Sequence, residues 1–193
     1  MGKSTQIRLS GAGGQGLITA GVILAEAALQ EGKTVVQTQT YGPEARLGSS
    51  KSEVIIAASG RIAYPQVTVP DILICLSEES ARKYVTQTNA KTMVLFDSTF
   101  VPPSVTGQGA IHRLPITETA VALGNKMAAN TVALAVVNRL ANLVSEGALK
   151  AAVTARVPAK FRALNEKALL AGDELARTGK VPSGLAAAAP ATR

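Results

Sequence analysis

The stretch IRLSGAGGQGLITAGVILAEAALQEGKTVV, residues 7–36, indicates the fold of this 193-residue chain. Residues 7–10 alternate as a short strand, and a glycine-rich turn leads into an apolar, alanine-rich helix expected from Leu17 to Gln30. Gly32 is placed to end that helix, and a second strand is expected to begin at Val35. A strand, a crossover helix and a second strand form a β-α-β unit with parallel strands and a right-handed crossover.

The rest of the chain continues to alternate between strands and helices. Two apolar runs have the composition of strands buried on both faces, and an alternating strand around Val54 is expected to form a hairpin with residues 60–64. Ser77 is placed to cap a helix whose first turn carries two glutamates. The remaining expected elements are strands at residues 71–76, 92–96 and 111–114 and helices at residues 117–124, 126–144 and 161–170.

These elements predict an α/β domain with an open, mostly parallel, Rossmann-like sheet, helices on both faces and the glycine-rich loop after the first strand. We expect this domain to span residues 1–180. Residues 181–193 are rich in proline, glycine, serine and alanine. They are expected to form a C-terminal tail that is flexible or ordered by a partner.

The glycine loop, residues 11–16, has the spacing G-x-G-x-x-G between a strand and a helix, where free N–H groups attract an anion. A dinucleotide site also needs an acidic residue at the end of the second strand, but residues 37–40 read QTQT. A P-loop needs Lys and Ser/Thr where Leu17 and Ile18 stand. Independent NAD binding and nucleotide hydrolysis are therefore disfavoured. A turn that serves packing alone and a loop that binds another anion both remain open.

The composition narrows the class of protein. The net charge of +7 favours an anionic partner, but the basic residues are scattered, and aromatic residues make up only 3%, so we expect no nucleic acid binding. The single cysteine, Cys75, forms no internal disulfide and holds no iron–sulfur cluster. No apolar run reaches membrane-spanning length and the first residues do not resemble a signal peptide, so we expect a cytoplasmic protein without membrane insertion.

Several motifs together resemble a known family. They are GAGGQG at residues 11–16, YGPEARLG at 41–48, SKSEVIIA at 50–57, PDILICLSEES at 70–80, LGNKMAANTVAL at 123–134 and FRALNEKALLAG at 161–172. In this order they are similar to the γ-type domain of the 2-oxoacid:acceptor oxidoreductases, which act on pyruvate, 2-oxoglutarate, branched-chain or aryl 2-oxoacids. The resemblance covers almost all of the chain before the tail, and the combination of motifs is specific although each motif alone is not.

The resemblance implies a subunit of a heteromeric complex that converts a 2-oxoacid and coenzyme A (CoA) to acyl-CoA and carbon dioxide. Thiamine diphosphate and iron–sulfur clusters are then expected in partner subunits, and the electrons pass to ferredoxin or another acceptor. The γ-type domain packs against the thiamine subunits and helps to hold CoA. A free-standing Rossmann-type nucleotide-binding oxidoreductase and a structural interaction module are the alternatives. The sequence does not indicate which 2-oxoacid, which acceptor or which subunit stoichiometry applies.

The candidate site residues follow from the phosphates of CoA, which backbone N–H groups and guanidinium groups match. Arg46 and Lys51 are the candidate cations, Glu44 is placed to orient Arg46 or to face the thiamine subunit, and Tyr41 is placed to pack on adenine. A surface Glu44–Arg46 ion pair and a loop-packing tyrosine are equally open. The family commonly has Arg-Gly-Gly where Arg46-Leu47-Gly48 stands here. The full set of candidates is Gly11, Gly13, Gly14, Gln15, Gly16, Tyr41, Glu44, Arg46 and Lys51.

No residue of the chain is expected to be catalytic or to bind a metal. His112 lacks a nearby Cys or carboxylate motif, Cys75 lies inside a buried run, and Asp97 is expected in a turn. Asn125 and Asn130 are expected to cap a buried helix or to contact a partner subunit. The absence of a nucleophile–base pair or of metal-ligand spacing indicates an assisting subunit.

Overall fold

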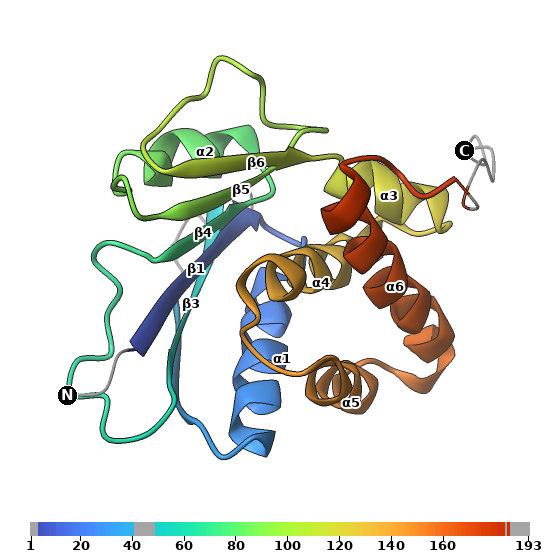
Figure 1. Ribbon diagram of the computed structural model, residues 1–193. Coiled ribbons are helices and arrows are strands. Elements are labelled where there is room, and N and C mark those ends of the chain that lie inside the picture. The colour runs from blue at the N-terminus through green and yellow to red at the C-terminus, as the bar shows by residue number, and fades with distance from the viewer. Residues whose placement is uncertain (1–3, 41–48, 184, 186–193) are drawn as a thin grey trace.

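One mixed sheet organises the molecule (Figure 1). The structure is a computed structural model, and it describes residues 4–40, 49–183 and 185. Within this part of the chain the strand order is β2-β3-β1-β4-β5-β6. The strands are β1 (Ser4–Ala12), β2 (Thr34–Thr40), β3 (Ser49–Ala57), β4 (Ile72–Cys75), β5 (Met93–Asp97) and β6 (Ala110–Leu114).

The sheet is parallel except at β3. β1, β4, β5 and β6 pair in parallel, whereas β3 lies between β1 and β2 and pairs antiparallel with both. The expected parallel direction of β1 and β2 is therefore confirmed, although β3 separates the two strands. The predicted hairpin between β3 and residues 60–64 is wrong, because residues 60–64 form no strand. Both edges of β3 are already paired, so no edge is left for a hairpin partner.

The helices cover both faces of the sheet, as predicted. In Figure 1, α2 lies on one side of the strands, and α1, α4, α5 and α6 form a layer on the other side. Because side chains alternate across β1 and β4, Ile7, Leu9 and Ile74 pack in the core under α1 and α4, whereas Leu73 and Cys75 pack under α2. The helices are α1 (Leu17–Gln30), α2 (Glu78–Val85), α3 (Ile116–Ala122), α4 (Ala129–Ala141), α5 (Glu146–Arg156) and α6 (Arg162–Thr178).

Local signals predicted α1 and α2 well. α1 has the expected bounds and closes with Gly32 at a φ of 72°. The Ser77 side chain accepts a hydrogen bond from the backbone N–H of Ser80, as expected of a cap. The predicted helix over residues 126–144 is confirmed at its centre, but residues 126–128 form a 3-10 turn and α4 ends at Ala141, where the cap residue Asn142 adopts a left-handed conformation with a φ of 48°. α5 then begins after this break and was not among the expected elements.

The C-terminal end of the described chain lies close to the predicted domain boundary at residue 180. α6 ends at Thr178, and Gly179 closes it with a φ of 70°. Of the expected tail, residues 184 and 186–193 lie outside the described residues, so the boundary at residue 180 stays a prediction. None of the helices that the structure describes combines the length and apolar character needed to cross a membrane.

Candidate functional site

The glycine loop joins the carboxyl end of β1 to the start of α1. Gly14 and Gly16 have φ values of 86° and 73°, which L-residues with side chains rarely adopt. Gly13 and Gly14 are exposed. Gly16 precedes the helix, and among the described residues no side chain caps α1. The N–H groups of the first turn are therefore left without a side-chain acceptor at the positive end of the helix dipole, which suits an anion.

Gln15 supports the glycine loop from inside. Its side-chain oxygen accepts a hydrogen bond from the backbone N–H of Ala12 at 2.7 Å, and its side-chain nitrogen donates to the carbonyl of Leu76 at 3.0 Å. A Cβ atom on Gly11 would lie 2.3 Å from the Gln15 oxygen, so the missing side chain makes room for this amide. The Gln15 side chain thus ties the loop to the end of β4, and its proposed part in ligand binding stays a prediction.

Asn130, in the first turn of α4, supports the loop from the other side. Its side-chain nitrogen donates to the carbonyl of Gly16 at 3.2 Å. A Cβ atom on Gly16 would lie 2.6 Å from that nitrogen. Gly16 is therefore required both by its φ and by the close approach of α4. The sequence pattern did not reveal this contact, because it joins residues 114 positions apart.

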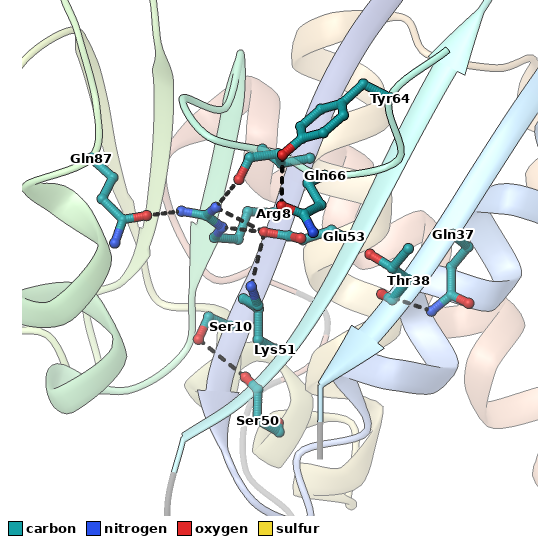
Figure 2. A network of polar contacts seen from close by, with 11 residues as sticks. Arg8, Ser10, Gln37, Thr38, Ser50, Lys51, Glu53, Tyr64, Gln66 and Gln87 are labelled. Atoms are coloured by element: carbon teal, nitrogen blue, oxygen red, sulfur yellow. Dashed lines mark hydrogen bonds and ion pairs between the residues drawn. The ribbon is translucent and has the colours of Figure 1, made fainter. Parts of the chain in front are cut away.

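A buried ionic cluster lies on the α2 side of β1 and β3 (Figure 2). The Arg8 guanidinium donates to Oε1 of Glu53, with Nε and one Nη each 2.8 Å from that oxygen. The Nζ of Lys51 lies 3.2 Å from the same oxygen. Arg8 also donates to the side chain of Gln87 and to the carbonyl of Val67. Arg8 and Glu53 were not among the residues selected from the sequence; the available signal was one charged residue between apolar neighbours in β1, Ile7 and Leu9, and one beside the apolar run 54–56 in β3.

Strand register places Lys51 next to the glycine loop. Ser10 pairs with Lys51, and the following residue, Gly11, pairs with Ser50. The hydroxyl of Ser10 donates to the carbonyl of Ser50 at 3.1 Å. The structure therefore brings two of the predicted parts, the glycine loop and Lys51, to the carboxyl end of β1. The N-terminus of α1 there suits an anion, whereas the Lys51 ammonium extends along β3 toward Glu53 on the α2 side of the sheet.

Three predicted site residues, Tyr41, Glu44 and Arg46, lie outside the described residues. They belong to the connection between β2 and β3. Thr40, the last described residue before this connection, is fixed in the sheet by its pairing with Lys51. The described ends of this connection therefore meet the sheet beside Lys51.

The other polar residues singled out in the sequence have structural roles. Asp97 is fully buried and accepts hydrogen bonds from the backbone N–H groups of Thr99, Ile116 and Thr117 and from the Thr117 hydroxyl. It thus caps the start of α3. Burial raises the pKa of the Cys75 thiol to about 12. In the described part of the chain, no three His, Cys, Asp or Glu side chains gather as a metal site.

Comparisons with known proteins identify the family of the chain. The family profile for pyruvate ferredoxin/flavodoxin oxidoreductase matches residues 6–175. The chain belongs to this family. The match spans the sheet, the glycine loop and nearly all of α6, and it confirms the resemblance drawn from the motifs.

Individual members of the pyruvate ferredoxin/flavodoxin oxidoreductase family match over long stretches. The 2-oxoglutarate synthase subunit KorC of Methanocaldococcus jannaschii is 42% identical over 178 residues, which are 89% of this chain and 94% of KorC. The crystal structure of the keto/oxoacid ferredoxin oxidoreductase γ subunit from Geobacter sulfurreducens PCA is 43% identical, with a TM-score of 0.77, over 90% of this chain and 98% of that subunit.

A larger enzyme contains the same fold. The structure of 2-oxoglutarate:ferredoxin oxidoreductase from Magnetococcus marinus, with 2-oxoglutarate, coenzyme A and succinyl-CoA bound, matches with a TM-score of 0.82 and 23% identity. The match covers 92% of this chain but 32% of the Magnetococcus chain. At this identity the likeness concerns the fold. Together with the family match, it confirms the predicted Rossmann-like α/β architecture.

Proposed function

We propose that this chain is the γ-type subunit of a 2-oxoacid:acceptor oxidoreductase that converts a 2-oxoacid and CoA to acyl-CoA and carbon dioxide. The observation that carries the proposal is the similarity to KorC over nearly the full length of both chains. KorC is a 2-oxoglutarate synthase subunit, so 2-oxoglutarate is the substrate that we favour. The reaction requires partner subunits that hold thiamine diphosphate and a ferredoxin-like subunit that holds iron–sulfur clusters.

The proposed contribution of this chain is to help bind CoA. The CoA-bound Magnetococcus enzyme, which contains this fold, supports the presence of CoA in the complex. The phosphates of CoA fit the N–H groups of the glycine loop and the ammonium of Lys51, whose backbone pairs with Ser10 just before that loop. Arg46 is proposed as a second cation, with Glu44 and Tyr41 in the same connection. Thiamine diphosphate supplies the decarboxylation chemistry from the partner subunits, and this chain orients the acyl acceptor.

The architecture disfavours a free-standing dinucleotide-binding enzyme. In dinucleotide-binding folds an acidic residue at the end of the second strand holds the ribose. Here β2 ends with Gln39 and Thr40, and β3 separates β2 from β1. We therefore expect no tight binding of NAD(H) or NADP(H) in calorimetric titrations of the chain, and tight binding would favour the free-standing enzyme over our proposal.

The proposal is tested by kinetics of the reconstituted complex with the variant Arg46→Ala. We expect the KM for CoA to rise about tenfold, because a charge-assisted hydrogen bond to a phosphate is lost. The KM for the 2-oxoacid should not change. Arg139→Ala is the matched control, because this arginine is exposed at the far end of α4 and its ion pair with Asp173 is 3.5 Å long. An unchanged KM for CoA in Arg46→Ala would remove Arg46 from the site.

A further inference from the structure

The Arg8–Glu53–Lys51 cluster contains two cations and one carboxylate, which is one cation more than charge neutrality requires. Arg8 and Glu53 are 3% and 6% exposed, and burial of a lone carboxylate is costly, so Glu53 needs a cation. Arg8 meets this need with its two contacts to Glu53 at 2.8 Å. Lys51 adds a second cation to the same oxygen. The three side chains therefore carry a net charge of one positive unit, and that unit belongs to Lys51.

Arg8 and Lys51 differ in how many of their N–H donors are already engaged within the protein. Arg8 divides its donors among Glu53, Gln87 and the carbonyl of Val67, and its guanidinium also lies 5.1 Å from the ring centre of Tyr84. It is thus fully engaged inside the protein. The Lys51 side chain is 23% exposed, and an ammonium has three N–H donors, of which Glu53 occupies one. Within residues 4–40 and 49–183, Glu53 is the one side chain that engages the Lys51 ammonium, which leaves donors for a ligand.

Glu53 also limits the freedom of Lys51. A free lysine side chain loses much of its rotamer entropy when it binds a ligand, and a partner that orders it beforehand lowers this cost. Figure 2 shows Lys51 extended along β3 toward Glu53, two residues further along the same face of the strand. The Arg8–Glu53 pair is neutral as a unit, so an approaching anion meets the full charge of Lys51 rather than a competing carboxylate.

We propose that Glu53, held in place by Arg8, is a positioning residue that presents Lys51 to a phosphate group of CoA. The inference rests on the proposed function and deepens it, because it assigns the anchor of one phosphate contact. Ser10 pairs with Lys51 and precedes the glycine loop, so the backbone of Lys51 lies near that end of β1, whereas its ammonium extends toward Glu53 on the α2 side of the sheet. The contact of Lys51 with a phosphate is therefore separate from the contact made by the glycine loop.

The test is a kinetic double-mutant cycle in the reconstituted complex, with Lys51→Ala, Glu53→Gln and the double variant. We expect Lys51→Ala to raise the KM for CoA about tenfold or more, and Glu53→Gln to raise it about threefold to tenfold. The double variant should match Lys51→Ala, since Glu53 acts through Lys51. The kcat and the KM for the 2-oxoacid should not change. Lys150→Ala on α5, which is 59% exposed, is the matched control and should leave all three constants unchanged.

A second variant separates positioning from folding. Glu53→Gln leaves Arg8 without its charge partner and can destabilise the chain, whereas the pair Arg8→Met and Glu53→Leu removes both charges together. We expect this paired variant to keep the thermal stability of the parent and still raise the KM for CoA, because Lys51 has lost its anchor. A folded paired variant with an unchanged KM for CoA would overturn the inference.

Substrate analogues identify the phosphate. If Lys51→Ala affects CoA but not dephospho-CoA, the lysine holds the ribose phosphate; if it affects both equally, the lysine holds the diphosphate. An equal loss with pantetheine, which has no phosphate, would overturn the inference.

The proposed function fails separately: an unchanged KM for CoA in Lys51→Ala with a raised KM for CoA in Arg46→Ala contradicts only the role of Lys51. Normal CoA kinetics in a complex without this chain contradict both.

Discussion

Gly16→Ala tests the geometry of the glycine loop most sharply. The substitution forces a residue with a Cβ atom into a φ of 73°, at a cost of about 1–2 kcal/mol. The new Cβ would lie 2.6 Å from the side-chain nitrogen of Asn130 and displace it from its hydrogen bond to Gly16, at a cost of about 1 kcal/mol. The expected loss in the free energy of unfolding is therefore about 2–3 kcal/mol, or a fall in Tm of about 4–12 °C.

The double variant Gly16→Ala with Asn130→Ala isolates the steric part of this loss. Without the Asn130 amide, the nearest remaining contact of the new Cβ is the Asn130 Cβ at 3.9 Å, which is ordinary packing. Urea denaturation of the four proteins of this cycle should show a double variant that is more stable than the sum of the single effects by about 1 kcal/mol. Gly147→Ala in α5 is the control, because its Cβ meets open space and should be neutral or slightly stabilising. Strict additivity would refute the assigned contact between the loop and α4.

Three further predictions concern other described residues. Cys75 should resist alkylation at pH 8 until the chain unfolds, since burial raises the pKa of its thiol to about 12; rapid labelling of the native chain would contradict this. Hydrogen bonds from Lys33 and Ser145 lower the pKa of Glu31 from 4.5 to about 2, so its stabilising contribution is complete above pH 4.5 and is lost as the pH falls toward 2. Glu31→Gln should accordingly flatten the acid limb of a stability–pH curve, and an unchanged slope would speak against the depressed pKa. Asp97→Ala should lower the free energy of unfolding by about 2–4 kcal/mol because the start of α3 loses its acceptor, and a loss below 1 kcal/mol in urea denaturation would argue against that role.

Much of the fold was predictable because its signals are local. The bounds of α1 follow from the glycine loop before it and Gly32 after it, and the Ser77 cap follows from the serine and the two glutamates beside it. The position of β3 between β1 and β2 was not predictable, because strand order depends on pairing between distant segments. The break at Asn142 was also hidden, because the apolar composition continues past it and the left-handed conformation of one asparagine decides it.

The candidate site also contains parts that the sequence predicted and parts that it did not. The glycine spacing and Lys51 were visible in the sequence, and the structure brings both to the end of β1. The supports were not visible. Asn130 reaches the loop from 114 residues away, and Arg8 meets Glu53 across 45 residues. Such contacts depend on which faces the fold brings together, and a motif within one segment carries no information about them.

The central claim is that the chain acts as a CoA-binding subunit without a redox centre of its own. Omission and add-back in the purified complex tests this most directly, with 2-oxoglutarate-dependent formation of succinyl-CoA as the readout. We predict that the partner subunits without this chain show a strongly raised KM for CoA, that added chain restores it, and that the chain alone is inactive. Full CoA-dependent activity of the partners without the chain, or oxidation of a carbonyl compound by the chain alone with reduction of NAD+, would contradict this claim.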